Sequence, residues 1–327
     1  MALHTLTLLV GGLVVLVVGA ELLLRGATRL SAMLGIAPVL IGLLVVSVGT
    51  SVPELAVGLT SASEGTAALS VGNVTGANLI NLLLILGISA WLRPLPTDSL
   101  SVRLDVPVMA IASTALFLLA MDGALEPGEG LLLLIGGVAY VAALFRTSRR
   151  EDRATLGEFA DSFAHAPVAS AGQAMTWGIH MLTLAIGIAM TVLGADWLVD
   201  GAVDLASQMD VSQSLIGLTI VAVGTTMPEL VTTLVATARN QRDVAIGNLV
   251  GSCIFNVLLI LGVTISLSEG GIPIGPTLRW IDLPLAAAVA LLSVPVFRTR
   301  RVVSRWEGGM LVMGYLAFMV SLLVWRT

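Results

Sequence analysis

Two copies of one short motif place a glutamate directly after a proline inside an apolar segment. They read Thr50-Ser51-Val52-Pro53-Glu54 and Thr225-Thr226-Met227-Pro228-Glu229. A proline within a helix removes a backbone donor and clashes with the preceding turn. We therefore expect freed carbonyl oxygens near Ser47, Thr50, Ala222 and Thr225. Carbonyls and carboxylates in apolar surroundings are costly unless a partner satisfies them, and a bound cation is one such partner.

A second motif follows each copy of the first and supplies amides and a hydroxyl. Gly72-Asn73-x-x-Gly76 leads to Asn81, and Gly247-Asn248-x-x-Gly251 leads to Asn256. The glycines permit a close backbone approach or a helix break. Asn81 and Asn256 can present amide oxygens to the centre that the glutamates share, and Ser252 can offer a hydroxyl. Asn73 and Asn248 are better explained as caps or links between helices.

Together these groups form an all-oxygen set of carboxylates, amides, hydroxyls and carbonyls. Hard cations such as Ca²⁺ and Na⁺ prefer such ligands, and the sequence has no histidine or cysteine cluster of the kind that softer metals favour. One buried glutamate could be a structural hydrogen-bond partner. Two at equivalent places are harder to explain in that way, because intramembrane carboxylates are costly and usually functional. We expect transported ions at this centre and no cofactor.

The two motifs belong to a long internal repeat. Residues 49–87 align with residues 224–262 at a constant offset of 175, and fifteen of the thirty-nine positions are identical. The same offset pairs Gly19-Ala20-Glu21 with Gly194-Ala195-Asp196. The chain is therefore predicted to be a duplication, with its centre where the copies are most alike.

Composition places the chain in a membrane. Of its 327 residues 57% are hydrophobic and 11% are charged, against roughly 25% charged in a typical soluble domain. The apolar runs are long enough to cross a bilayer, which takes about 20 residues each. We predict an all-α membrane protein with ten spans near residues 4–24, 33–61, 66–91, 104–121, 129–145, 175–199, 208–238, 243–267, 280–297 and 307–325.

Each half of the duplication holds five predicted spans, an odd number, so the second copy must enter the membrane inverted. Inverted repeats are a recurring design of secondary transporters, with substrate sites near the midplane at interrupted helices. The predicted division is a first repeat over 1–145, a cytoplasmic linker loop over 146–173 and a second repeat over 174–327.

The arginines predict the orientation. The chain has sixteen arginines and no lysine, and fourteen of the arginines fall in the connections after spans 1, 3, 5, 7 and 9. Arg279 and Arg326 fall on the other side. The positive-inside rule then places both termini outside the cytoplasm of a multi-pass cell-membrane protein.

Several other classes of protein do not fit. The net charge of −5 argues against a nucleic-acid partner, and the single cysteine, Cys253, excludes an intrachain disulfide. The sequence has no H-E-x-x-H, G-x-S-x-G or Walker A pattern, so we expect neither an enzyme nor an ATP-driven pump. An antiporter or a passive cation channel remains. A monomer would suffice, because one chain already contains both halves of the site.

At these motifs the chain resembles the cation/calcium exchanger superfamily, in particular the prokaryotic sodium/calcium exchanger type. That family carries G-T-S-x-P-E and G-N-x-x-G-S-N/C-x-x-N/D twice, matched here at 49–54, 72–81, 224–229 and 247–256. The resemblance implies Ca²⁺ export driven by Na⁺ through alternating access, with spans 1 and 6 sliding across the core. The ligands that it implies are Glu54, Glu229, Asn81, Asn256, groups of Thr50, Ser51, Thr225, Thr226 and Ser252, and the carbonyls of Ser47 and Ala222.

Two departures from the family pattern leave the coupling ion and the stoichiometry open. This chain has asparagine at both positions 81 and 256 (Asn81 and Asn256), whereas some family members have an aspartate at one of them. Ala77 also lies where a serine is common in the family. Two carboxylates are neutralised by one Ca²⁺, by two Na⁺ or by two protons. Exchange of Ca²⁺ for H⁺ therefore remains an alternative to exchange of Ca²⁺ for Na⁺. A passive channel could use the same centre, although a channel does not need inverted halves.

Overall fold

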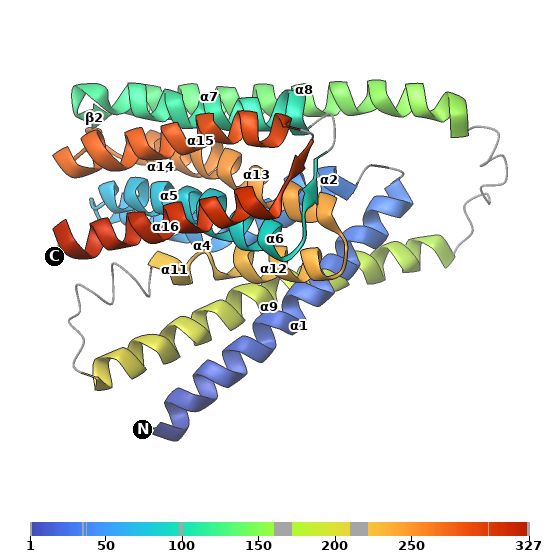
Figure 1. Ribbon diagram of the computed structural model, residues 1–327, viewed down its shortest axis with the longest axis horizontal. Coiled ribbons are helices and arrows are strands. Elements are labelled where there is room, and N and C mark those ends of the chain that lie inside the picture. The colour runs from blue at the N-terminus through green and yellow to red at the C-terminus, as the bar shows by residue number, and fades with distance from the viewer. Residues whose placement is uncertain are drawn as a thin grey trace.

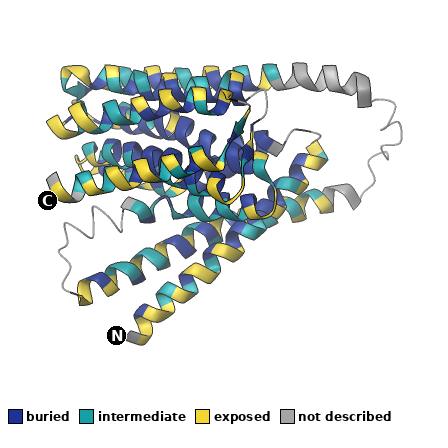
Figure 2. Ribbon diagram, viewed as in Figure 1, coloured by how far each residue is buried: buried dark blue, intermediate teal, exposed yellow. Residues whose placement is uncertain are grey.

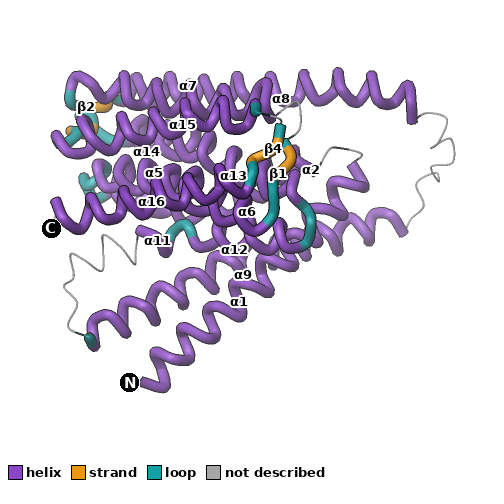
Figure 3. The backbone as a smooth tube through the Cα atoms, viewed as in Figure 1, coloured by secondary structure: helices purple, strands orange, loops and turns teal. Residues whose placement is uncertain are grey.

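A computed structural model of the chain describes residues 2–34, 36, 38–97, 101–159, 172–209, 222–299 and 301–325. The described chain is a bundle of long helices with a few very short strands (Figures 1 and 3). The α-helices are α1 (Ala2–Leu34), α2 (Pro38–Ile41), α3 (Ser47–Thr50), α4 (Val52–Ser63), α5 (Ala68–Leu79), α6 (Leu86–Leu92), α7 (Val106–Leu119), α8 (Pro127–Phe159), α9 (Gly172–Gln208), α11 (Ala222–Gly224), α12 (Met227–Ala238), α13 (Arg242–Phe255), α14 (Gly262–Leu267), α15 (Leu283–Arg298) and α16 (Arg305–Trp325).

Short π-helical segments continue several of these helices. They are η1 (Gly42–Val46), η2 (Ile80–Ile85), η3 (Ser101–Asp105), η6 (Asn256–Leu261) and η7 (Leu278–Asp282). A single 3₁₀ turn, η4 (Ala120–Asp122), follows α7. π-Helical turns are rare and frequently occur at functional sites. These segments are therefore places to look for a functional site.

Seven of the described helices are long and apolar enough to cross a membrane, and an eighth span is counted if one bent pair is included. The bent pair is Val39–Thr50 and Val52–Ser63, which meet at 46°. Burial separates central from peripheral helices: 83% of the apolar window in Arg242–Leu267 is buried, against 22% in Pro127–Thr147. Figure 2 shows the same contrast, with exposed residues on the outer helices. The fold therefore surrounds α13 and faces the lipid with α8.

Two predicted span boundaries were wrong. Helix α1 continues to Leu34 rather than ending near residue 24, and α9 continues to Gln208 rather than ending near residue 199. The predicted boundaries were drawn where hydrophobicity falls, but Arg25 and Arg29 are good helix formers and do not end a helix. Helix α8 also continues to Phe159, into the segment predicted as a linker. Residues 160–171 of that linker lie outside the described residues.

Glycines at seven-residue spacing pack α1 closely against α9. A Cβ added at Gly12, Gly19 or Gly26 would lie 2.6, 2.6 or 2.7 Å from the backbone nitrogen of Leu198, Thr191 or Leu184. Partner numbers fall as glycine numbers rise, so the two helices are antiparallel. Gly187 and Gly194 of α9 face the backbone of α1 in the same way, at Leu23 and Leu16. Small residues that let backbones approach are typical of membrane helix interfaces.

The α1/α9 pair is attached to the rest of the bundle through its own apolar cluster. Leu23, Leu24 and Ala27 of α1 pack with Ile41 and with residues of α9, α12 and α13, apart from the larger core built around α5–α7 and α13–α15. Figure 1 shows the pair lying obliquely beside the bundle. It is therefore a distinct layer of the structure.

The strands connect the two halves of the chain. Strand β1 (Leu95–Pro96) pairs antiparallel with β4 (Val302–Val303), and β2 (Ala124–Leu125) pairs with β3 (Ile272–Pro273). Each ribbon takes one strand from each half, and β1 and β3 follow the same region of the internal repeat. This reciprocal exchange is the pattern that a two-fold axis between the halves produces.

Arginines gather at the β1–β4 end of the bundle. Arg242 donates to the Pro94 carbonyl at 3.3 Å, and Arg305 donates to the Leu92 carbonyl at 3.4 Å. Arg279 lies at the other end, where it donates to the Met121 carbonyl. The separation agrees with the partition read from the sequence. That the arginine-rich end faces the cytoplasm stays a prediction.

The neighbouring glycines Gly11 and Gly12 test the α1/α9 interface. We expect Gly12→Ala to lower stability by about 1–3 kcal/mol, because its methyl group would meet the backbone of Leu198. Gly11→Ala is the matched control, since nothing lies within 4 Å of its added Cβ. It should be neutral or slightly stabilising. Thermal unfolding in detergent measures both, and equal midpoints would contradict the close packing.

Candidate cation-binding site

The proline motifs break their helices at equivalent points. Ser51 separates α3 from α4, and Thr225 and Thr226 separate α11 from α12. The φ, ψ values are −85°, 15° at Ser51 and −92°, 6° at Thr226. Pro53 and Pro228 then occupy the first turn of the next helix, where a missing N–H costs little. Glu54 and Glu229 lie in the same first turns. The helix dipole favours a negative charge there.

The two carboxylates are fully buried and largely without hydrogen-bond partners. Glu54 is 0% exposed and Glu229 is 1% exposed. Both oxygens of Glu54 and Oε2 of Glu229 have no partner, while Ser51 donates to Glu229 Oε1 at 3.0 Å across the two halves. The carboxylates are also close enough to repel each other. A buried carboxylate without a partner is costly, so this centre demands positive charge.

The predicted amide ligands face the same kind of deficit. Asn81 lies within π-helical segment η2 and Asn256 begins η6. Both are buried, and Oδ1 of each side chain has no partner, nor has the hydroxyl of Ser252. Ser252 and Thr50 also lie beside the Glu229 carboxylate. The structure thus leaves unsatisfied oxygen atoms on carboxylate, amide and hydroxyl side chains, which are the groups that a hard cation prefers.

Links between the halves hold the broken helices in place. Thr50 donates to Asn248 Oδ1 at 3.2 Å, and Thr225 donates to Asn73 Oδ1 at 3.3 Å. Each threonine therefore bonds to the G-N-x-x-G asparagine of the other half. This agrees with the interpretation of Asn73 and Asn248 as links between helices. It also shows that Thr50 and Thr225 orient the site by their hydroxyls.

Asn78 was missed by the sequence analysis. It accepts a hydrogen bond from Asn256 Nδ2 at 3.1 Å and donates to the Cys253 carbonyl at 3.2 Å. Because the Asn256 amide nitrogen faces Asn78, the Asn256 amide oxygen points away from Asn78. Its repeat equivalent is Cys253, so the two copies do not share an oxygen ligand at this position.

The Ser47 carbonyl has hydrogen-bond partners of its own. The Ser47 carbonyl accepts the Ser51 N–H at 3.0 Å and the Thr50 hydroxyl at 3.3 Å, so the proline does not free it. In a regular helix the N–H at Pro53 would bond to residue Gly49, so that carbonyl is the one which loses its donor. The Ser47 hydroxyl donates to the Leu43 carbonyl.

The remaining predicted residues are placed less directly. Thr226 is buried, and its hydroxyl donates to the Val223 carbonyl at 2.8 Å rather than to Glu54. Ala222 begins α11, one turn before the break. Their roles as ligands, like that of the Ser47 carbonyl, stay predictions.

A cavity of about 440 Å³ lies beside the Thr225–Asn73 link between the halves. Its lining includes Asn73, Gly76, Thr225, Asp282 and Tyr315. Among the described residues, no cluster of three or more His, Cys, Asp or Glu side chains could hold a metal. The two buried carboxylates, Glu54 and Glu229, and the oxygens around them are the candidate cation site of the described residues.

A duplicated bundle of membrane-crossing helices with buried carboxylates at two helix breaks defines an ion-transporting membrane protein. A family model described as sodium/calcium exchanger protein matches residues 4–146 and 179–324. The chain belongs to this family of exchangers, and it is an antiporter of the sodium/calcium exchanger class.

Individual relatives agree over almost the whole chain. The putative antiporter CaxA of Alkalimonas amylolytica is 34% identical, over 94% of this chain and 95% of its own length. The sodium/calcium exchanger MaX1 of Methanosarcina acetivorans is 29% identical, over 95% of this chain and 96% of its own. A solved structure of the sodium-calcium exchanger NCX_Mj superposes with a TM-score of 0.83 at 24% identity, covering 98% of this chain and 100% of that one. This last likeness supports the fold.

The unsatisfied carboxylate makes a prediction for stability. With Ca²⁺ removed by a chelator, Glu54→Gln should raise the free energy of unfolding by about 1 kcal/mol or more, because the substitution removes a buried charge that has no partner. Added Ca²⁺ at 100 times its Kd should stabilise the native chain by about 2.7 kcal/mol and the variant far less. Thermal unfolding with and without Ca²⁺ measures both effects.

Glu126→Gln serves as the control for that experiment, since Glu126 is exposed at a connection. It should leave both the basal stability and the response to Ca²⁺ unchanged. A Ca²⁺ response of equal size in Glu54→Gln and the native chain would place the cation elsewhere.

Proposed function

We propose that the chain exchanges Ca²⁺ for Na⁺ across the cell membrane by alternating access, as a monomer and without a resident cofactor. The observation that carries this proposal is the set of buried oxygens of Glu54, Glu229, Asn81 and Asn256 that lack hydrogen-bond partners. A hard cation would satisfy them. The name of the relative MaX1, a sodium/calcium exchanger, supports this choice of ions.

The proposed architecture has ten spans in two inverted repeats with both termini outside the cytoplasm. The eight candidate spans support it, and two more segments would complete it: α11 with α12, and α16. The reciprocal pairing of β1 with β4 and β2 with β3 is the symmetry that inverted halves require. The arginine-rich end would face the cytoplasm.

The α1/α9 pair is the moving part in this proposal. Its helices are locked to each other by interleaved glycines, whereas a smaller apolar cluster connects them to the rest of the bundle. Apolar contacts are non-directional, so one such surface can slide over another at little cost compared with breaking the glycine interface. We infer that the pair moves as one body, exposing Glu54 and Glu229 to one side at a time.

Charge balance sets the proposed stoichiometry. Glu54 and Glu229 together carry two negative charges in a buried site. One Ca²⁺ or two monovalent cations neutralise them, whereas an empty or overcharged site would leave net charge in a low-dielectric interior. The exchange is therefore obligatory, one Ca²⁺ for two monovalent ions, and moves no net charge.

Uptake of ⁴⁵Ca²⁺ into proteoliposomes tests the coupling. An outward Na⁺ gradient should drive uptake, and Glu54→Gln and Glu229→Gln should each reduce it by at least about tenfold through loss of a charged ligand. Glu126→Gln should transport normally. Uptake driven by an outward proton gradient alone would replace Na⁺ by H⁺ as the coupling ion. Ca²⁺ flux without any counter-ion would indicate a channel.

Membrane potential tests the charge balance. Setting the potential with K⁺ and valinomycin should leave the initial rate of Na⁺-driven Ca²⁺ uptake unchanged in the native chain. Asn256→Asp adds a third carboxylate and should make the rate depend on the potential, because a third monovalent cation can then enter. A strong voltage dependence of the native chain would refute two-for-one exchange.

A further inference from the structure

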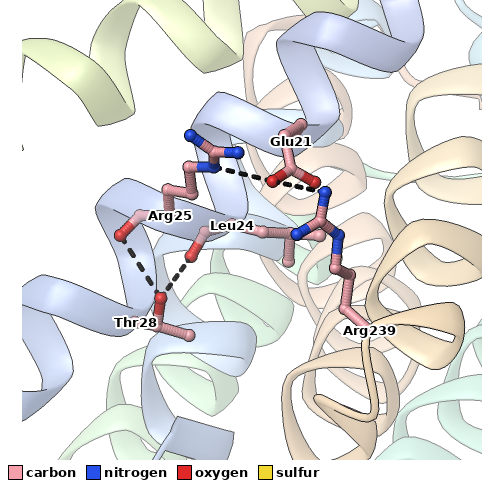
Figure 4. A network of polar contacts seen from close by, with 5 residues as sticks. All are labelled: Glu21, Leu24, Arg25, Thr28 and Arg239. Atoms are coloured by element: carbon pink, nitrogen blue, oxygen red, sulfur yellow. Dashed lines mark hydrogen bonds and ion pairs between the residues drawn. The ribbon is translucent and has the colours of Figure 1, made fainter.

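An ion pair ties the α1/α9 pair to the helix that carries Glu229. Glu21 of α1 accepts from Arg25 Nε at 2.7 Å and from a terminal nitrogen of Arg239 at 2.8 Å, both on Oε1 (Figure 4). Arg25 belongs to the same helix, so its contact connects nothing else. Arg239 is the residue that ends α12, and α12 begins at the Thr226 break with Glu229 in its first turn.

The position of Glu21 makes this contact more than a surface ion pair. The Glu21 side chain is 18% exposed, against 55% for Arg239 and 64% for Arg25. It lies in the second half of a long membrane-suited helix, where an unpaired carboxylate is costly. Sliding α1 along the bundle would separate Glu21 from Arg239 but not from Arg25.

The internal repeat has no equivalent of this contact at the other end. The offset of 175 maps Glu21 onto Asp196 of α9, and it maps Glu64 onto Arg239. Glu64 ends α4 just as Arg239 ends α12, and both Glu64 and Asp196 are exposed. Both residues at these equivalent positions are carboxylates, which would repel each other if brought together, whereas Glu21 and Arg239 attract. Glu64 is also unfavourable to its own helix, because a negative charge at a helix C-terminus opposes the dipole.

We propose that Glu21 and Arg239 form a one-sided latch that favours the conformation described here and must open in every transport cycle. The inference rests on the proposed alternating access. In the conformation that opens to the other side of the membrane, the two-fold relation between the halves would bring Asp196 close to Glu64. The attraction between Glu21 and Arg239 would then be replaced by repulsion between Asp196 and Glu64. The two facing states therefore differ in free energy, and these positioning residues set the difference without touching the ion.

The two arginines that share Glu21 provide matched variants. Arg239→Gln and Glu21→Gln should change the rate of Na⁺-driven Ca²⁺ uptake, or the ratio of the apparent Ca²⁺ affinities at the two faces, by about two- to fivefold. Arg25→Gln removes an equivalent contact to the same oxygen but leaves the cross-helix link, so it should behave like the native chain. Equal effects of Arg25→Gln and Arg239→Gln would overturn the latch.

Charge exchange separates a latch from a general packing role. In an Arg25→Gln background, combining Glu21→Arg with Arg239→Glu should restore the native rate and affinity ratio, whereas either substitution alone should not. Each variant is first required to elute as a single species and to gain stability with Ca²⁺. Failure of a folded, Ca²⁺-responsive double variant to recover would also overturn the proposal.

Hydrogen exchange keeps this test independent of the transported ions. The C-terminal turn of α12 and the facing turn of α1 should exchange faster in Arg239→Gln than in Arg25→Gln, with no Ca²⁺ or Na⁺ gradient present. If the native chain transports nothing, the proposed function fails while this comparison still reports whether the contact closes the interface. Identical hydrogen-exchange rates in the two variants would overturn the proposed latch, even if the protein transports Ca²⁺.

Discussion

Two carboxylates enclosed in an apolar bundle constrain most of this structure. A charge away from water is tolerated where compensation is available, and Glu54 and Glu229 find little among the described side chains. Both carboxylates lie in the first turn of a helix, so helix dipoles supply part of the compensation. The rest must come from ions that enter and leave. The same energetic deficit that would destabilise an ordinary core is what couples one ion to another.

The surrounding scaffold holds this unfavourable centre by linking the halves. Thr50 reaches Asn248, Thr225 reaches Asn73, and the strand ribbons join the same halves at both ends of the bundle. Each half completes the other, so neither repeat could build the site alone. The π-helical segments at Asn81 and Asn256 widen the central helices at the level where the oxygens converge.

Departures from symmetry give the molecule a direction. Ser51 bonds to Glu229, whereas its equivalent Thr226 bonds to its own backbone, so the two carboxylates are held differently. Glu21 is paired across helices through Arg239, whereas Asp196 and Glu64 at the equivalent positions are both acidic. A duplicated fold would otherwise give two facing states of equal energy. Such substitutions are how a symmetric architecture can favour one of them.

The sequence by itself determined the membrane class, the duplication and the central residues, because these follow from hydrophobicity, a constant offset and the cost of a buried glutamate. Its division of the arginines agrees with the ends of the bundle at which Arg242, Arg305 and Arg279 lie. It misjudged the ends of α1 and α9, because a fall in hydrophobicity marks the edge of the lipid and not the end of a helix. Only the tertiary structure decided that the Ser47 carbonyl is already bonded, that Asn78 positions Asn256, and that Glu21 meets Arg239. The physical reason is that a hydrogen bond or ion pair needs two atoms about 3 Å apart, often from residues far apart in the chain, and no local sequence pattern fixes that distance.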